Sequence, residues 1–416
     1  MLKQYIEDIC KKAKDAFFDL SSIGEDKINN VLNTLVELIE KNAEEIKRVN
    51  EIDLENAKKD GLSSALIDRL LLNDKRIKGM VDSIKTLISL RSPVGEIIDG
   101  WTIENGLSIE KIRVPIGVVG IIYESRPNVT IDAATLCLKS SNCAILRGGK
   151  EAINSNRFLS ELIKEALRLN DVNENCAGFI DKTDREGVLH LAKADKYVDV
   201  IVPRGGEGLI KFVANNATVS VIKHDKGLCH TYIDKDADLE KALDISFNAK
   251  VQRPGVCNAM ETLLVHKDIA DKFLPKFKEL MDKANVELRG CEKTLEMLDI
   301  KRAEESDWDE EYLDLILSIK VVDNLDDAVK HINRHGSNHS EAIVTENYTN
   351  AEEFLNRVDA SCVYVNASTR FTDGGVFGMG AEIGISTNKL HARGPVGLSE
   401  LTTYKYKIRG NGQIRQ

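Results

Sequence analysis

Hydrophobic residues recur every three to four positions through about the first 90 residues of the chain. The clearest run has charged or polar residues between its apolar members, which are Ile28, Val31, Leu32, Leu35, Val36, Leu38 and Ile39. This spacing places the apolar side chains on one face of a helix, where they can pack against a core. We therefore predict a helical N-terminal region and assign no function to the apolar stripe.

The pattern changes after Ser92-Pro93-Val94-Gly95, where apolar and polar residues begin to alternate. The segment from about 95 to 114 has Asn105-Gly106 at its centre. An Asn-Gly pair between two alternating segments is the usual signature of a β-hairpin. Such an arm either pairs with another chain or folds onto its own domain, and the pattern does not decide between the two.

From Pro115 onward, short and continuously apolar runs alternate with helical patterns. The expected strands lie near 116–122, 144–146, 178–180, 198–202 and 219–222, with helices near 130–138, 156–169 and 185–196. A second series has strands near 261–265, 286–288, 318–322, 341–344 and 362–365, with helices near 239–250 and 269–284. Strands that are buried on both faces read as apolar runs, so this alternation predicts α/β domains with mostly parallel sheets.

Composition limits the class of protein. A length of 416 residues allows two or three domains, and the 42% hydrophobic and 30% charged contents are typical of a globular protein. The formal net charge of −10 argues against general affinity for nucleic acid or anionic membranes. Neither a bilayer-spanning apolar stretch nor a signal-peptide pattern is present. The eight cysteines form no Cys-x-x-Cys pair, which favours a reducing cytoplasmic setting over a disulfide framework or zinc ribbon.

The most informative cysteine is Cys257, which follows Arg253-Pro254-Gly255 and precedes Asn258. Proline and glycine hold such a segment in a loop or at a helix start. Backbone amides at a turn can stabilise a thiolate or an oxyanion, as a nucleophilic cysteine requires. The alternative is a buried cysteine that behaves as a small hydrophobe.

Two expected strand ends carry Gly-Gly beside cations. Neither standard phosphate-loop motif is present. Arg147-Gly148-Gly149-Lys150 instead combines close backbone approach with two cations, which suits a phosphorylated ribose but is also compatible with a solvated turn. Arg204-Gly205-Gly206 is similar and less specific. Parallel sheets bind ligands at the carboxyl ends of their strands, so both turns are candidate sites.

Two further polar groups have competing interpretations. Asn128 follows Arg126-Pro127 and either donates an amide N–H to an oxyanion or caps the next helix. His331, His335 and His339 recur every four residues, a spacing that aligns ligands on a helix. Because Gly336 interrupts them and no carboxylate completes the set, we predict no metal site and expect a solvated helix end.

Several longer motifs are similar to those of the aldehyde dehydrogenase superfamily and, more narrowly, the γ-glutamyl phosphate reductase family. They occur in the family order over nearly the whole chain, as PIGVVGIIYESRPNVT (115–130), AILRGGK (144–150), VPRGGEGL (202–209), QRPGVCNAMETLL (252–264), VYVNASTRFTDGG (363–375) and KLHARGPVGLSELTT (389–403). The resemblance implies two Rossmann-like domains and a hairpin oligomerisation arm. We expect an NADP-binding domain over 1–235, a catalytic domain over 236–370 and a C-terminal return and oligomerisation tail over 371–416.

The resemblance also implies roles for individual residues. Cys257 would be the nucleophile, and Asn128 and the Cys257 amide would be the oxyanion donors. The cofactor would be NADPH/NADP, because a lysine stands where NAD-preferring members often have glutamate. The implied cofactor-binding residues are Arg147, Lys150, Gly205, Gly206 and Glu311, although the Phe-Gly-Pro that usually follows the glutamate is absent here.

The implied reaction reduces L-glutamyl 5-phosphate to glutamate 5-semialdehyde through a cysteine thioester, in proline biosynthesis. The phosphate and α-carboxylate of the substrate require cations and donors, for which the candidates are Arg126, Ser368, Thr369 and Arg370. The segment 224–230 lacks the water-activating glutamate of hydrolytic members, which argues against a hydrolytic dehydrogenase. A catalytically silent binding module on the same fold is the other alternative. We also expect a homo-oligomer, either a dimer or a dimer of dimers, and association with glutamate 5-kinase.

Overall fold

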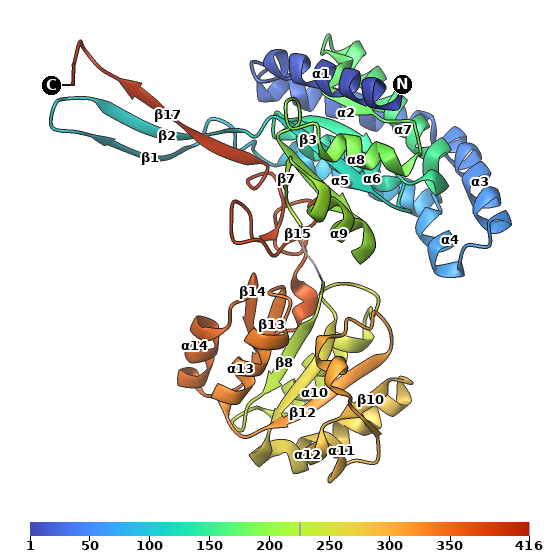
Figure 1. The fold of residues 1–416 in the computed structure, drawn as a ribbon, viewed down its shortest axis with the longest axis vertical. Helices are drawn as coiled ribbons and strands as arrows, with labels where there is room; N and C mark the ends of the chain where they lie inside the picture. Colours follow the sequence, from blue (N-terminus) through green and yellow to red (C-terminus); the bar gives the residue numbers. More distant parts are fainter. Residues whose placement is uncertain (224–225, 416) are drawn as a thin grey trace. The chain divides into compact units, whose positions relative to one another are not determined.

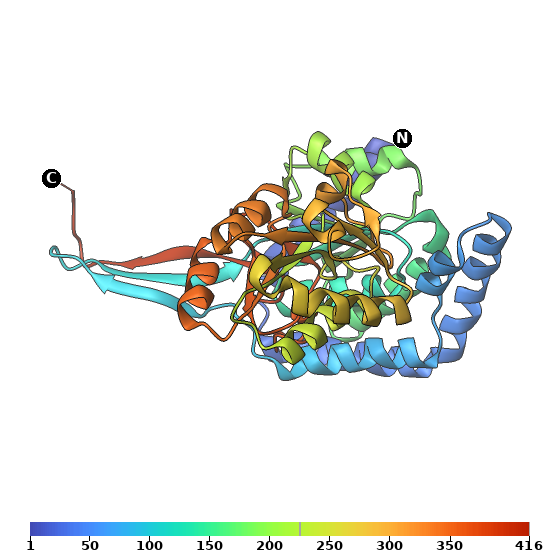
Figure 2. The ribbon, with the colours of Figure 1, turned by 90° about the horizontal axis from the view of Figure 1, so that it is seen from below.

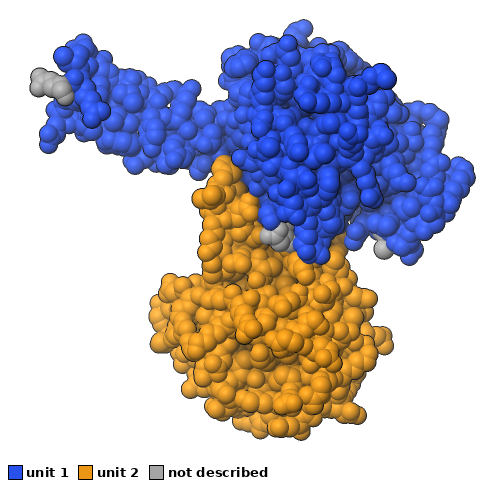
Figure 3. Space-filling view, in the orientation of Figure 1, with its two compact units in different colours: residues 1–223, 378–384, 395–416 blue, residues 224–377, 385–394 orange. Residues whose placement is uncertain are grey.

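The computed structural model of the chain describes residues 1–223 and 226–415. Its contacts divide it into two compact units, which are coloured separately in Figure 3. Unit 1 comprises Met1–Lys223, Gly378–Gly384 and Pro395–Gln416, and unit 2 comprises His224–Phe377 and Ile385–Gly394. The first division of the chain thus falls after residue 223, twelve residues before the end of the cofactor domain that the sequence suggests.

The helical N-terminal region of unit 1 forms as the apolar spacing predicts. The helices are α1 (Leu2–Leu20), α2 (Glu25–Lys41), α3 (Ala43–Lys59), α4 (Ser64–Leu70) and α5 (Asp74–Ser89). All seven apolar residues of the clearest stripe are buried on α2. Two helix starts are capped by side chains, because Ser63 accepts the N–H of Leu66 and Asn73 accepts that of Arg76.

A parallel sheet of five strands forms the centre of unit 1 in the described residues, in the order β5-β4-β3-β6-β7. The strands are β3 (Val118–Tyr123), β4 (Cys143–Arg147), β5 (Ala177–Phe179), β6 (Val200–Arg204) and β7 (Ser220–Val221). The helices between them are α6 (Asn128–Lys139), α7 (Ile153–Leu169), α8 (Arg185–Ala192) and α9 (Glu207–Asn216), with short 3₁₀ turns η1 (Lys150–Ala152) and η2 (Glu174–Cys176). Because β3 lies between β4 and β6, their carboxyl ends share one edge of the sheet.

The predicted hairpin is confirmed as β1 (Ile97–Thr102) paired antiparallel with β2 (Ser108–Pro115). A third strand, β17 (Thr402–Arg409), pairs with the other edge of β2 in the same chain. Figures 1 and 2 show these three strands as an arm that runs away from the parallel sheet of their own unit. Aromatic and aliphatic side chains on the arm are exposed, among them Trp101, Tyr404, Tyr406 and Ile408.

Unit 2 has a seven-stranded parallel sheet in its described residues, in the order β11-β10-β12-β9-β8-β13-β14. The strands are β8 (Cys229–Ile233), β9 (Met260–His266), β10 (Glu287–Gly290), β11 (Lys301–Arg302), β12 (Ile316–Val322), β13 (Ser340–Val344) and β14 (Cys362–Val365). The helices are α10 (Leu239–Val251), α11 (Lys267–Lys283), α12 (Glu292–Leu295), α13 (Leu325–His335) and α14 (Tyr348–Arg357), with 3₁₀ turns η3 (Glu305–Asp309) and η4 (Thr369–Phe371). The short strands β15 (Ile385–Ser386) and β16 (Gly394–Pro395) pair near the end of the chain.

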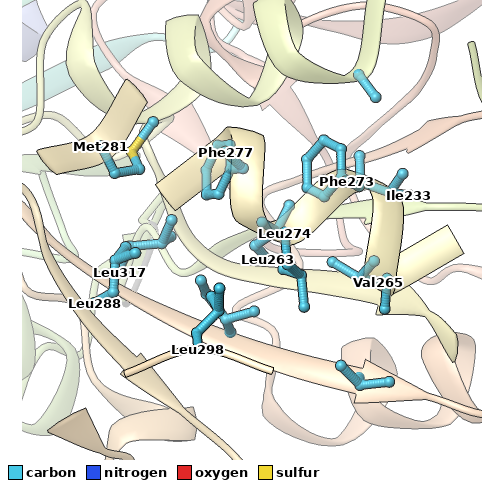
Figure 4. Packing of buried hydrophobic residues seen from close by; sticks show 14 of the residues in the cluster. Ile233, Leu263, Val265, Phe273, Leu274, Phe277, Met281, Leu288, Leu298 and Leu317 are labelled. Carbon is cyan, nitrogen blue, oxygen red and sulfur yellow. The ribbon is translucent and has the colours of Figure 1, made fainter. Parts of the chain in front are cut away.

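One core of unit 2 lies between α11 and the sheet. Phe273 and Phe277 stack with their ring centroids 5.3 Å apart, and Figure 4 shows them beside Leu263 and Val265 of β9. Buried aromatic and aliphatic side chains of this kind supply most of the hydrophobic stabilisation of a domain. The core fixes β9, and therefore fixes the loop that leads into it.

The α/β fold class predicted from the sequence is confirmed, with two parallel sheets and an antiparallel arm. Among the described residues, no helix is both long enough and apolar enough to cross a bilayer.

Candidate functional site

Cys257 lies on a loop between α10 and β9, as its sequence context predicts, and is half-buried. Asp238 caps the start of α10 by accepting the N–H of Lys241. The helix ends at Val251, and Pro254 then disfavours helical backbone at Arg253. The thiol is therefore held between two regular elements without belonging to either.

The backbone of Cys257 is held by residues at the start of β8 and just before it. A Cβ atom on Gly227 would lie 2.1 Å from the Cys257 carbonyl oxygen and 2.2 Å from its Cα, so only glycine allows this approach. The Cys229 thiol donates to the same carbonyl oxygen at 3.2 Å. Burial raises the pKa of Cys229 well above its ordinary value, which keeps this thiol protonated. The Gly227 N–H donates to Glu311 Oε1 at 2.9 Å.

Glu311 therefore contacts the segment that supports the cysteine, and its proposed role toward a nicotinamide ribose stays a prediction. The segment predicted to lack a water-activating glutamate includes His224 and Asp225, which lie outside the described residues. From Lys226 to His230 the segment has no carboxylate of its own. The Glu311 carboxylate reaches Gly227 from a distant part of the chain, a contact that the sequence pattern alone could not reveal.

Three of the expected substrate-binding residues lie against the cysteine loop. Thr369 donates its hydroxyl to the Asn258 carbonyl at 2.8 Å, and Ser368 accepts the backbone N–H of Arg370 at 3.3 Å. The Arg370 Nε donates to Gln252 Oε1 at 2.9 Å. Both hydroxyls are buried and hold the chain in place. Arg370 thus has the clearest geometry for a ligand contact among these three.

The electrostatic environment of Arg370 connects it to the thiol. Burial lowers the pKa of Arg370, the neighbouring Arg253 lowers it further, and Cys257 acts in the opposite direction. An arginine retains its charge despite such a shift, because its ordinary pKa is above 12. A positive charge near Cys257 favours the thiolate, which is the nucleophilic form.

A buried ion pair connects the two elements that flank the loop. Lys250 near the end of α10 lies 2.5 Å from Glu261 in β9, and both side chains are fully buried. Glu261 also accepts the N–H of Leu313 at 3.2 Å. Burial raises the pKa of Glu261 to about 7, and Lys250 opposes this shift. Sequence reasoning missed the pair, since eleven residues and a loop separate its members.

In unit 1, Arg126 and Asn128 follow the carboxyl end of β3. Pro127 is the residue before α6, so Asn128 begins the helix and is not its cap. One amide N–H of Asn128 donates to Asp132 Oδ2 at 2.8 Å, which orients the side chain. Burial raises the pKa of Asp132 to about 6. Arg126 is half-buried on the same connection.

The two cations at the carboxyl end of β4, Arg147 as its last residue and Lys150 three residues later, have different environments. Arg147 is 7% exposed, and its guanidinium donates to the Thr183 and Asp184 carbonyls at 2.9 and 3.2 Å. Lys150 is exposed, and its nearest ion-pair partner, Asp60, is 3.8 Å away. Lys150 is therefore available to a soluble ligand, whereas Arg147 mainly fixes the strand end.

Gly205 and Gly206 follow β6 on the same edge of the sheet. Glu124 Oε2 accepts the Gly206 N–H at 2.9 Å, and a Cβ atom on Gly205 would lie 2.3 Å from that oxygen. Glu151 similarly accepts the N–H and hydroxyl of Ser125. Sequence reasoning missed both carboxylates. The Gly206 amide thus already binds an anionic oxygen, and with the exposed Lys150 this edge fits a phosphate-bearing dinucleotide.

The prediction of a solvated helix end at the three histidines is wrong, because His331 and His339 are buried and only 7% of the His335 side chain is exposed. The rings of His331 and His335 pack together with their centroids 4.6 Å apart. The Nδ1 of His331 is 3.1 Å from Lys320 Nζ, and that of His335 is 2.8 Å from Asp309. His339 contacts Ser340, beyond the end of α13. Within residues 1–223 and 226–415, no group of three or more His, Cys, Asp or Glu side chains is placed to hold a metal ion.

Comparison with known proteins shows the family. The model of the aldehyde dehydrogenase family matches residues 2–297 and 296–405. A γ-glutamyl phosphate reductase from Nautilia profundicola is 56% identical over 99% of this chain and 100% of its own length. One from Nitratiruptor is 59% identical with the same coverage.

Solved structures agree with the sequence comparison. A γ-glutamyl phosphate reductase from Thermotoga maritima matches with a TM-score of 0.97 and 50% identity, over 99% of this chain and 100% of that one. An acetylating aldehyde dehydrogenase from Geobacillus thermoglucosidasius, 18% identical with a TM-score of 0.71, shows that the fold extends to more distant members. The chain belongs to the aldehyde dehydrogenase family and, within it, to the γ-glutamyl phosphate reductases.

Proposed function

We propose that this protein reduces L-glutamyl 5-phosphate to L-glutamate 5-semialdehyde and phosphate with NADPH, as a step of proline biosynthesis. The observation that carries the proposal is the Cys257 loop, in which a half-buried thiol has its backbone fixed by Gly227 and Cys229. The relatives at 56 to 59% identity over their full lengths are named for this reaction.

In the proposed mechanism the Cys257 thiolate attacks the acyl carbon of the substrate, and phosphate leaves as the thioester forms. Asn128 and the Cys257 amide donate to the oxyanion, and each well-placed donor of this kind contributes about 3 kcal/mol. The hydrogen bond from Asn128 to Asp132 holds the amide in one orientation. Arg126 and Arg370 are the proposed partners of the substrate's phosphate and α-carboxylate.

NADPH, when bound, supplies the hydride that reduces the thioester to the aldehyde. Lys150 is the proposed partner of the 2′-phosphate, because its ammonium group is exposed at the edge of the unit 1 sheet. The turn at Gly205 and Gly206 is the proposed pyrophosphate contact. Arg147 supports this edge through the carbonyl groups of Thr183 and Asp184.

A hydrolytic dehydrogenase is the main competing activity. The two activities differ in the acyl acceptor, because the proposed enzyme run in reverse passes its acyl group to phosphate and a hydrolase passes it to water. The sequence of residues 224–230 contains no glutamate, which supports phosphate as the partner. Glu311 is held by the Gly227 N–H, and its activity as a base is part of what the test decides.

The test follows NADP⁺ reduction by glutamate 5-semialdehyde with and without inorganic phosphate. We expect turnover that requires phosphate and is lost in Cys257→Ala. Cys362→Ala is the matched control, since it removes another half-buried thiol outside the loop. Phosphate-independent turnover would indicate hydrolysis, and activity in Cys257→Ala would exclude the thioester.

We also propose that the chain forms a dimer or a dimer of dimers through the arm. The exposed apolar residues of the arm, including Trp101 and Ile408, support this. Light scattering should show a multimer, and removal of the arm should give monomers.

We further propose that the enzyme associates with glutamate 5-kinase, which would bring an unstable acyl phosphate directly to it. Co-sedimentation of the two proteins tests this association. A cytoplasmic location is consistent with the lack of disulfide bonds among the described cysteines.

A further inference from the structure

Unit 2 contains an open cavity with a volume of about 510 Å³. It lies between α12, the carboxyl end of β12 and the length of α13. Its lining combines basic side chains, carboxylates and apolar atoms, and its residues are Cys291, Glu292, Lys293, Lys320, Val321, Val322, Asp323, Asp327, Lys330, His331, Arg334 and His335. None of these residues lies in the cysteine loop, and none has a role in the proposed reaction.

The end of the cavity at Asp323 is remote from Cys257 along the sheet. β12 and β9 run parallel, with Val322 paired to His266. Cys257 precedes Met260, which begins β9, whereas Asp323 follows the end of β12. Seven residues of strand span roughly 20 Å, so the Asp323 end of the cavity and the thiol lie at opposite ends of β9.

Two of the cations around the cavity are neutralised by carboxylates and two are not. Lys293 pairs with Asp323 at 2.8 Å, and Lys330 pairs with Asp326 at 2.6 Å. The Lys320 Nζ instead lies 3.1 Å from His331 Nδ1 and 5.2 Å from the centroid of the Trp308 ring. Among the described residues, Lys320 and Arg334 form no ion pair with a carboxylate. The cavity is lined by four cationic side chains, Lys293, Lys320, Lys330 and Arg334, and by three carboxylates, Glu292, Asp323 and Asp327. Cations therefore exceed carboxylates in the lining by one, and Lys320 and Arg334 are the two that no carboxylate of the described chain holds.

His331 lies beside Lys320, with its ring edge-on to the rings of His230 and Trp308 at centroid distances of 5.5 Å. It is 5% exposed, and burial lowers its pKa so that the ring is neutral. Because the Lys320 ammonium has only protons to donate, His331 Nδ1 accepts and the ring proton lies on Nε2. That Nε2 has no hydrogen-bond partner among the described residues. Since Nε2 is itself buried, the part of this histidine that bears on the cavity is Nδ1, which holds the Lys320 ammonium.

We propose that this cavity binds a small organic anion with phosphate or carboxylate groups, and that Lys320 and Arg334 provide the counter-charges. An arginine fork and a lysine point charge are the usual combination for such groups. A volume of this size holds a metabolite rather than a single inorganic ion. The inference is independent of the reaction proposed for Cys257.

The test is calorimetric titration of the full-length protein in a phosphate-free buffer, with pyrophosphate and citrate as probes for the two chemistries. We expect at least one probe to bind at a site that weakens by about tenfold or more in Arg334→Gln and in Lys320→Gln, because each variant removes one charge-assisted contact. Arg334 is exposed, so its variant tests the site without disturbing a core. Lys276→Gln is the matched control, an exposed lysine on α11.

The variant Arg370→Gln distinguishes this cavity from the cysteine loop. Binding that is unchanged in Arg370→Gln and Lys276→Gln but weakened in the two cavity variants supports the proposal. Binding that is lost in Arg370→Gln and retained in the cavity variants would place the anion at the cysteine loop and overturn it. The absence of saturable binding for both probes would also overturn it.

Discussion

The contact between Gly227 and the backbone of Cys257 gives the sharpest test of how the nucleophile is positioned. Gly227 is not among the positive-φ residues of the described chain, so its backbone conformation does not require glycine. The requirement comes from space alone. A Cβ atom would meet the carbonyl oxygen, Cα and carbonyl carbon of Cys257 at 2.1, 2.2 and 2.5 Å.

In Gly227→Ala these backbone atoms have to move by roughly 1 Å to restore normal contact. A displacement of this size at a reacting group costs about 100-fold in rate. The overpacking itself destabilises a fold by about 1 to 3 kcal/mol, which leaves a stable domain folded. We therefore expect kcat/KM for phosphate-dependent NADP⁺ reduction to fall by about 100-fold in a protein that still melts cooperatively.

Gly255→Ala is the matched control, because this glycine lies in the cysteine loop and its added Cβ would approach only the Leu313 carbonyl oxygen, at 3.5 Å. We expect its activity to stay within a few-fold of wild type. Alkylation of Cys257 by iodoacetamide should slow in Gly227→Ala and remain normal in Gly255→Ala. Wild-type turnover in Gly227→Ala would refute the argument that this contact positions the nucleophile.

Three further changes test other parts of the account. Lys150→Glu should lower kcat/KM for NADPH relative to NADH by about tenfold or more, as measured with both cofactors, because it removes the proposed 2′-phosphate partner; an unchanged ratio would contradict this role. Lys250→Met should lower the free energy of unfolding by about 3 kcal/mol in denaturant titrations, since it leaves the buried Glu261 without its cationic partner, and adding Glu261→Leu should restore much of the loss. If the double variant is as unstable as the single one, the ion pair is not the cause. The pKa of Asp132 is raised to about 6 in the folded protein. Between about pH 4 and pH 6 the folded protein therefore keeps a proton that the unfolded chain releases, and the free energy of unfolding falls as the pH rises. Asp132→Asn should remove up to about 3 kcal/mol of this pH dependence in melts between pH 4 and 7, and an unchanged slope would assign it to other groups.

Local pattern predicted most of the fold because the strands of both units are apolar and the helices between them are amphipathic. The strand β8 was missed, since its sequence Cys-His-Thr-Tyr-Ile lacks an apolar run although every residue is buried. His230 can be buried in this strand because the Glu341 carboxylate on the neighbouring strand accepts hydrogen bonds from its backbone N–H and its ring Nδ1, at 2.7 and 2.9 Å. A polar strand of this kind is recognisable only when its partner strand is known.

The candidate site was predictable to a lesser extent. The motif around Cys257 indicated the loop, and the resemblance supplied Asn128 and the cofactor residues. The supporting contacts were not predictable, because Gly227, Cys229 and Glu311 reach the cysteine loop from separate segments. For Arg147 the sequence predicted a contact with a ligand, because the residue lies at the carboxyl end of β4. In the structure its guanidinium donates to two backbone carbonyl groups of the protein instead.

The central claim is that Cys257 forms a glutamyl thioester that phosphate, and not water, discharges. The most direct measurement mixes the enzyme with glutamate 5-semialdehyde and NADP⁺ in the absence of phosphate and maps the product by peptide mass spectrometry. We expect a single burst of NADPH, with the acyl adduct on the Cys257 peptide, and loss of the adduct when phosphate is added. Continuous NADPH production without phosphate, or a burst with no adduct on Cys257, would contradict it.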